Sequence, residues 1–108
     1  MAEATSPDLA VPALCILGDF TIFAAADLKP KIIEAINQGE TDEVVIDLAD
    51  VSEIDSAGLQ LMVMAMREGA AQSKNVRFTR HSEPVLNLID LFGLSGFFGT
   101  PALAGSTH

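Results

Sequence analysis

The sequence predicts an α/β fold with a mixed, mostly parallel β-sheet, and three observations support this. β-prone runs alternate with segments of helical periodicity along the chain. The run at 44–48 (Val-Val-Ile-Asp-Leu) is nearly continuous in apolar residues, as is typical of a strand buried on both faces. The chain has 108 residues, of which 49% are hydrophobic, so one domain can form a core without disulfides. We expect four to five strands and three to four helices in the order β-β-α-β-α-β-α.

The first two strands are predicted from short apolar runs. Residues 13–17 form one run, which ends at Gly18-Asp19, a turn signal. Residues 20–23 (Phe-Thr-Ile-Phe) form the second run. Two short runs joined by a turn make an antiparallel hairpin possible, and we therefore expect a mixed sheet.

A helix is expected over about 24–38, with Gly39 as its C-terminal stop. Its apolar residues recur at helical spacing: Leu28, Ile32 and Ile36. Pro30 conflicts with a helix interior and is tolerated best in or near the first turn.

The second half predicts a strand at 44–48, a loop at 49–55 and a helix of about 15 residues that opens at Ser56. The core stripe of this helix is Leu59, Met62, Val63 and Met66. Beside the stripe lie Leu61, Met64 and Ala65, which either fill the edge of the core or form a partner surface.

A strand at 76–79 and a last helix, capped by Ser82 and ended by Gly93, complete the predicted domain. The apolar face of that helix is Val85, Leu88, Ile89 and Phe92. We expect a flexible N-terminus over 1–12, the domain over 13–98 and a flexible C-terminus over 99–108. Phe97 and Phe98 are expected to pack the chain end onto the core, or to form a dimer patch if exposed.

The charge balance excludes several partners. Fifteen acidic and six basic residues give a net charge of −9, which argues against nucleic acid and anionic membranes. Eight of the acids lie between residues 32 and 66, where no Lys or Arg occurs. They form either a solvated acidic face or a complement to a basic partner. These residues are Glu34, Glu40, Asp42, Glu43, Asp47, Asp50, Glu53 and Asp55.

The sequence predicts neither a metal site nor a membrane segment. The single Cys15 rules out an internal disulfide and multi-Cys metal sites. Its simplest interpretation is a buried, small apolar residue. No apolar stretch approaches the roughly 20 residues of a membrane helix, and no basic signal-peptide region precedes the domain, so we expect a cytoplasmic protein. The small basic cluster Arg77, Arg80 and His81 is a weak candidate for anion binding.

Residues 47–59, which run from the end of the predicted buried strand into the next helix, contain the strongest candidate site. Ser56 is predicted as the helix N-cap, with the small residues Ala57 and Gly58 leaving the backbone open to approach. One interpretation is that Ser56 is only a cap. The other is that its hydroxyl is modified, because a phosphate there would meet free N–H groups and the acidic side chain of Asp55.

At this point the sequence resembles the STAS domains, the bacterial anti-sigma factor antagonists and their relatives. The resemblance rests on Asp55-Ser-Ala-Gly-Leu59 and the preceding Val44 to Ile54. It extends to Leu17-Gly-Asp-Phe20, similar to the first hairpin of the family, and to Val85 to Leu94, similar to its last helix. Together these segments cover about residues 13–98.

The resemblance implies a protein-binding switch, not an enzyme, and we expect no cofactor. In the family, a serine-kinase anti-sigma factor phosphorylates the serine of this motif, which blocks partner binding, and a serine phosphatase restores it. That serine falls on Ser56, and Ala57 replaces a second hydroxyl residue often found there. The partner-binding residues expected here are Asp19, Asp55, Ser56, Ala57, Gly58, Gln60, Leu61 and Met64. A monomer or weak dimer is expected.

Two alternatives remain open at this stage. Residues 21–30 and the motif Ile54 to Leu61 are also similar to STAS proteins associated with chemotaxis or with lipid-transport ATPases. That similarity implies constitutive docking, with Ser56 acting only as a cap. An enzyme or nucleotide-binding protein is the third class, but the chain has no evident nucleophile–base pair and no phosphate-binding glycine loop.

Overall fold

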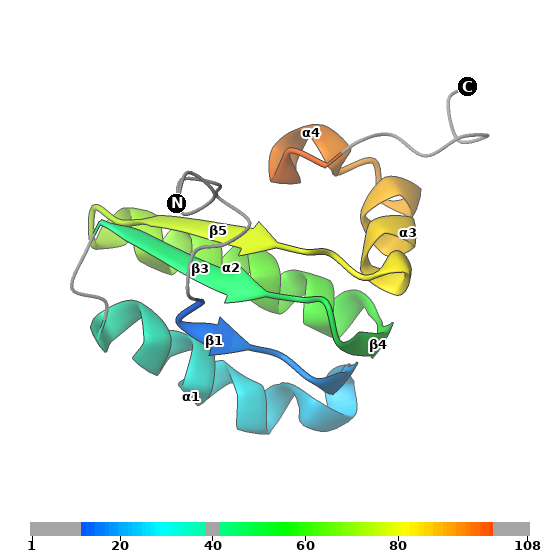
Figure 1. Ribbon diagram of the computed structural model, residues 1–108, viewed down its shortest axis with the longest axis horizontal. Helices are drawn as coiled ribbons and strands as arrows, with labels where there is room; N and C mark the ends of the chain where they lie inside the picture. The colour runs from blue at the N-terminus through cyan, green and yellow to red at the C-terminus, as the bar shows by residue number, and fades with distance from the viewer. Residues whose placement is uncertain (1–11, 39–41, 101–108) are drawn as a thin grey trace, which may run out of the picture.

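The α/β fold class is confirmed, with two parallel sheets flanked by helices (Figure 1). The computed structural model describes residues 12–38 and 42–100. Three strands form one sheet in the order β1-β3-β5, and two form a second sheet, β2-β4. The strands are β1 (Leu14–Cys15), β2 (Gly18–Phe20), β3 (Glu43–Asp47), β4 (Val51–Ile54) and β5 (Asn75–Thr79). The helices are α1 (Ile22–Gln38), α2 (Ser56–Ala71), α3 (Glu83–Leu91) and α4 (Ser95–Phe98).

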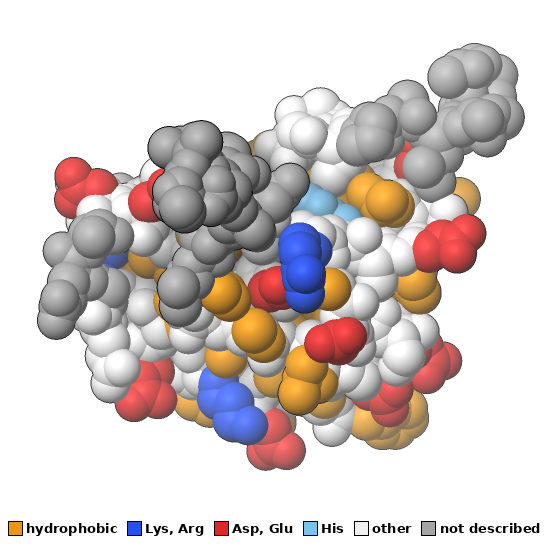
Figure 2. Space-filling view, in the orientation of Figure 1, with side chains coloured by type: hydrophobic (Ala, Val, Ile, Leu, Met, Phe, Trp, Pro, Cys, Tyr) orange, Lys and Arg blue, Asp and Glu red, His pale blue; other side chains and the backbone are white. Residues whose placement is uncertain are grey.

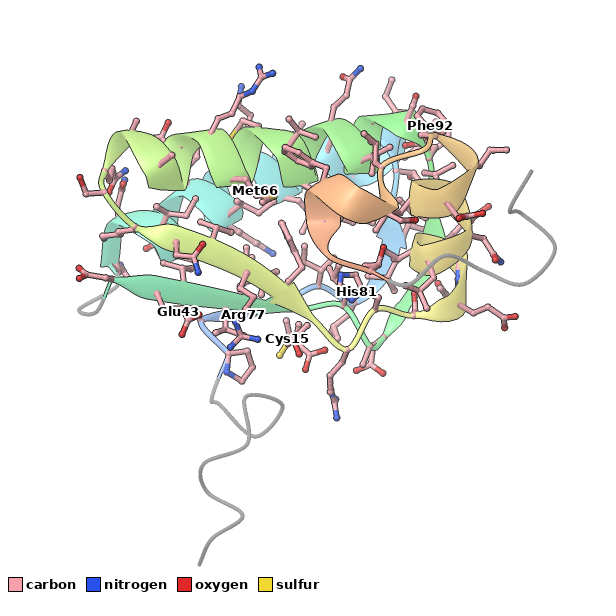
Figure 3. All side chains as sticks on the ribbon, turned by 90° about the horizontal axis from the view of Figure 1, so that it is seen from above. Cys15, Glu43, Met66, Arg77, His81 and Phe92 are labelled. Atoms are coloured by element: carbon pink, nitrogen blue, oxygen red, sulfur yellow. The ribbon has the colours of Figure 1, made fainter. Side chains whose placement is uncertain are left out.

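The core lies between the three-stranded sheet and the two long helices. Figure 3 shows α1 and α2 on one side of this sheet, with Met66 pointing from α2 toward the strands. Val44 and Ile46 of β3 are buried, as their β-branched run predicts. The helices contribute side chains at helical spacing, and these include the fully buried Ile32, Ile36, Met62 and Ala65.

The first helix begins earlier than predicted, and Pro30 therefore lies in its middle rather than near its first turn. Two oxygens make the earlier start possible. The Asp55 carboxylate accepts from the Ile22 N–H, and the Thr21 hydroxyl accepts from the Phe23 N–H. Pro30 removes one helical hydrogen bond, but it is exposed, as is Ala26 four residues before it, so water can satisfy the freed carbonyl.

The predicted antiparallel hairpin is wrong for the described residues, in which every ladder is parallel. β1 pairs with β3, whereas β2 pairs with β4, a strand inside the segment 49–55 that was predicted to be a loop. β4 is short and exposes Ser52 and Glu53, so its sequence lacks a strong apolar run. Only its pairing with β2 makes it a strand.

Cys15 is exposed, contrary to the predicted buried position. β1 is an edge strand, and Figure 3 shows Cys15, Glu43 and Arg77 on the side of the sheet that faces away from α1 and α2. Because residues alternate along a strand, the neighbouring positions Leu14 and Ile16 face the core instead.

The chain after α3 packs partly onto the core. The Phe98 ring meets the Phe78 ring edge to face, with centroids 6.1 Å apart, whereas Phe97 is about half exposed. The flexible termini predicted over 1–12 and 99–108 lie almost entirely outside the described residues, as does Gly39.

Candidate functional site

Asp55, not Ser56, is the N-cap of α2. Its backbone is extended, and its Oδ1 atom accepts hydrogen bonds from the N–H groups of Ala57 and Gly58, at 2.9 and 3.2 Å. Ser56 is therefore the first residue of the helix, with an exposed side chain. An aspartate and a serine in sequence compete for the same cap, and the carboxylate accepts the stronger, charge-assisted bonds.

The Asp55 carboxylate also joins two helices that are distant in sequence. Its Oδ2 atom accepts from the Ile22 N–H at 3.0 Å, so one side chain caps both α1 and α2. The bond from Ile22 is the largest of the causes that lower the pKa of Asp55; burial opposes the shift, and the Gly58 and Ala57 N–H groups add to it. Sequence reasoning missed this role, because the bond to Ile22 depends on how the chain folds back.

Gly58 lets the start of α2 pack closely against the end of β2. A Cβ atom at this position would lie 2.1 Å from the Phe20 carbonyl oxygen and 2.9 Å from Ile54 Cγ1. Only glycine fits that space without movement of the backbone. The space left by the missing side chain of Gly58 is thus filled by β2 and not by a partner. Gly58 is buried, contrary to the prediction that its backbone is open to approach.

The outward side of α2 continues from Ser56 along the helix. A shallow groove of about 480 Å³ is lined by Gln60, Val63, Met64, Arg67 and Glu68. Leu61 and Ala65, by contrast, belong to the core, and Leu61 is only 8% exposed. Leu61 therefore offers no surface to a partner, which corrects the prediction for this residue. Gln60 is exposed, whereas Val63 and Met64 are half-buried.

The acidic stretch does not form one continuous face. Asp47 is buried at the end of β3, where it pairs with Arg80 at 2.9 Å and accepts from the Ala49 N–H at 2.8 Å. Glu43 pairs with Arg77 on the side of the three-stranded sheet that faces away from α1 and α2. Both arginines of the predicted anion cluster are thus already paired with carboxylates.

Glu53 of β4 lies three residues before Ser56, and Asp19 lies on β2, the strand that pairs with β4. Asp19 and Glu53 are aligned partners in the β2–β4 ladder, and both are exposed. In the view of Figure 2, acidic and hydrophobic side chains lie together at the end of the molecule where α1 begins, without a Lys or Arg side chain on that part of the visible face. The site is therefore locally negative.

His81 is half-buried before α3, and burial lowers its pKa because the charged imidazolium is poorly solvated there. Its Nε2 atom has no hydrogen-bond partner. Within residues 12–38 and 42–100, no three His, Cys, Asp or Glu side chains are placed to hold a metal ion. No helix in the same ranges is long and apolar enough to cross a membrane.

The chain matches known proteins over most of its length. The model of the family described as "Mlab, STAS domain" matches residues 4–103. The anti-sigma-B factor antagonist of Bacillus subtilis (strain 168) is 30% identical over 79 residues, which cover 73% of this chain and 71% of the relative. The protein of the same name from Staphylococcus epidermidis is 30% identical over 77 residues, or 71% of this chain and 70% of the relative.

Two solved structures are similar in fold. The anti-sigma factor antagonist SpoIIAA in its unphosphorylated form aligns with a TM-score of 0.64 at 24% identity, covering 85% of this chain and 79% of that one. A sulfate transporter family protein from Wolinella succinogenes aligns with a TM-score of 0.63 at 13% identity, covering 89% and 81%. The geometry around Asp55 and Ser56 therefore belongs to a known domain type, and this chain is a member of the STAS domain family.

Proposed function

We propose that this protein is an anti-sigma factor antagonist-like switch that binds a serine-kinase anti-sigma factor, or an analogous signalling protein, when Ser56 is unphosphorylated. The observation that carries the proposal is the position of Ser56: its side chain is exposed at the first residue of α2, directly after the capping carboxylate of Asp55. Relatives that are named anti-sigma-B factor antagonists support the proposal.

The chemistry of the switch would take place on one oxygen. The kinase would transfer the γ-phosphoryl group of ATP to Ser56 Oγ: the new P–O bond forms, the bond to the bridging oxygen of ADP breaks, and a base on the kinase takes the hydroxyl proton. Because residue 57 is alanine, Ser56 is the one hydroxyl in the Asp-Ser-Ala-Gly motif. A serine phosphatase would reverse the step by hydrolysis.

The phosphate would change the surface through charge. It adds about −1.5 to −2 charges next to the Asp55 carboxylate and near the exposed Asp19 and Glu53. The partner surface we propose comprises the exposed Asp19, Ser56 and Gln60 and the half-buried Met64. Asp55, Ala57 and Gly58 shape the backbone beneath it. A partner that accepts a neutral hydroxyl at its contact with Ser56 would have to desolvate the new dianion, and binding would weaken.

The proposal is tested by incubating the protein with the purified serine-kinase anti-sigma factors of the same genome and ATP. We expect one phosphoryl group, located on Ser56 by mass spectrometry, and none on Ser56→Ala. The matched control is Ser52→Ala, which removes another exposed serine hydroxyl, from β4. Labelling of Ser56→Ala to the same extent as the native chain would refute Ser56 as the site.

A second candidate function is constitutive docking in a lipid-transport or chemosensory assembly, with Ser56 not modified. The similarity of residues 21–30 and of Ile54 to Leu61 to STAS proteins of such assemblies favours this alternative. It predicts that Ser56→Asp binds the partner as well as the native chain does. A loss of binding with the circular dichroism spectrum unchanged would contradict this alternative.

A further inference from the structure

Two exposed apolar side chains lie at the start of α1, directly beside the Ser56 loop. Ile22 is 65% exposed and Phe23 is 91% exposed. Single exposed apolar residues are ordinary on protein surfaces, but this adjacent pair is held in place by side chains. Asp55 Oδ2 accepts from the Ile22 N–H at 3.0 Å, and Thr21 Oγ1 accepts from the Phe23 N–H at 3.3 Å. The carboxylate that caps the Ser56 helix thus also fixes the Ile22–Phe23 pair.

The charges around this pair are acidic. Asp19 and Glu53 are aligned across the β2–β4 ladder just before Thr21 and Asp55, and like charges in that arrangement repel each other. Asp27 lies one helical turn beyond Phe23. The lysines of α1, Lys29 and Lys31, lie farther along the axis, about 9 and 12 Å from Phe23 by the helical rise.

We propose that Ile22 and Phe23 form the apolar anchor of the surface that binds the partner, and that the partner offers an apolar pocket bordered by Arg or Lys. This inference rests on the proposed function, since it assigns the kind of partner surface that meets the Ser56 site. A basic border would relieve the repulsion between Asp19 and Glu53, and a pocket would cover Phe23.

Other occupants fit these observations less well. A second copy docked about a twofold axis would place the same acidic border against itself. An anionic lipid surface would be repelled by the same carboxylates. A protein of complementary charge is the occupant that both the apolar pair and its border favour.

The test measures binding of the purified serine-kinase anti-sigma factors of the same genome by calorimetry. We expect Phe23→Ala to weaken binding at least roughly tenfold, as truncation of a central aromatic residue does in other interfaces, and Phe23→Leu to weaken it less. Because Phe23 is almost fully exposed, both variants should melt at the native temperature. The matched control is Phe97→Ala, which removes a half-exposed ring from α4, at the opposite edge of the molecule from α1 (Figure 1).

Each outcome decides between the two proposals. If Ser56→Asp weakens binding but Phe23→Ala binds like the native chain, the anchor is refuted and the proposed function stands. If no kinase binds the native chain, the proposed function fails and the anchor fails with it. If Phe23→Ala instead converts a dimer into a monomer in sedimentation, with unchanged kinase affinity, the pair is a contact between copies and the inference is overturned.

Discussion

Gly58→Ala tests the packing that sets the position of Ser56. The added Cβ would lie 2.1 Å from the Phe20 carbonyl oxygen and 2.9 Å from Ile54 Cγ1. Because the nearer atom belongs to the backbone, a change of side-chain rotamer cannot relieve the contact. Overpacking of this kind costs about 3 kcal/mol at the upper end of its usual range, and the better helix propensity of alanine returns about 1 kcal/mol. The free energy of unfolding should therefore fall by about 2 kcal/mol.

Thermal unfolding followed by circular dichroism measures this change. For a domain of this size, about 2 kcal/mol corresponds to a melting temperature lower by roughly 10 °C. The matched control is Gly96→Ala, because a Cβ at Gly96 meets no atom within 4 Å. Its effect should stay within about 0.5 kcal/mol. If Gly58→Ala melts with the native chain, α2 does not begin against β2, and the geometry described for the Ser56 site is wrong.

Three further predictions concern single residues. Ser73 has a φ of 59° just after the end of α2, a backbone conformation that favours glycine. Ser73→Gly should therefore raise the free energy of unfolding, measured by chemical denaturation, by up to about 1 kcal/mol. The control Ser52→Gly, on β4, should lower it. Burial lowers the pKa of His81 below 6.5, so as the pH decreases the unfolded chain binds a proton at this histidine before the folded chain does. The free energy of unfolding should therefore fall as the pH decreases below about 6.5, and His81→Gln should remove that loss. An unchanged pH profile of the variant would contradict the prediction. The pKa of Asp55 is lowered below 3.8, so the ionised Asp55 stabilises the fold above that pH, and this contribution is lost as the pH falls through the folded-state pKa. Asp55→Asn should therefore have a lower melting temperature than the native chain at pH 7, and its melting temperature should lack the part of the acid dependence that Asp55 causes.

The fold could be predicted from the sequence where local pattern and tertiary burial agree. The apolar run of β3 and the helical spacing of α2 each led to an element close to the observed one. β4 was missed because a strand of four residues with two exposed polar side chains has no strong periodicity. The pairing of β1 with β3, and of β2 with β4, depends on contacts that no local pattern encodes.

The motif predicts the start of α2, but it assigns the helix cap to Ser56, whereas the cap is Asp55. That Asp55 is the cap rather than Ser56 is visible only in the structure, where the Asp55 carboxylate accepts hydrogen bonds from three backbone N–H groups. Ile22 and Phe23 were predicted to end a strand run, whereas they begin α1 and are exposed. Burial is a property of the packed molecule, and for this reason Leu61 was also placed on the wrong side.

The central claim, that Ser56 controls partner binding, is tested most directly with homogeneous phosphoserine at position 56. Calorimetry under identical conditions measures how tightly each form binds a serine-kinase anti-sigma factor. The kinase used is the one that binds the unphosphorylated chain. We predict that phosphorylation weakens binding at least roughly tenfold while the melting temperature shows both forms folded. Equal affinity of the two forms would contradict the switch.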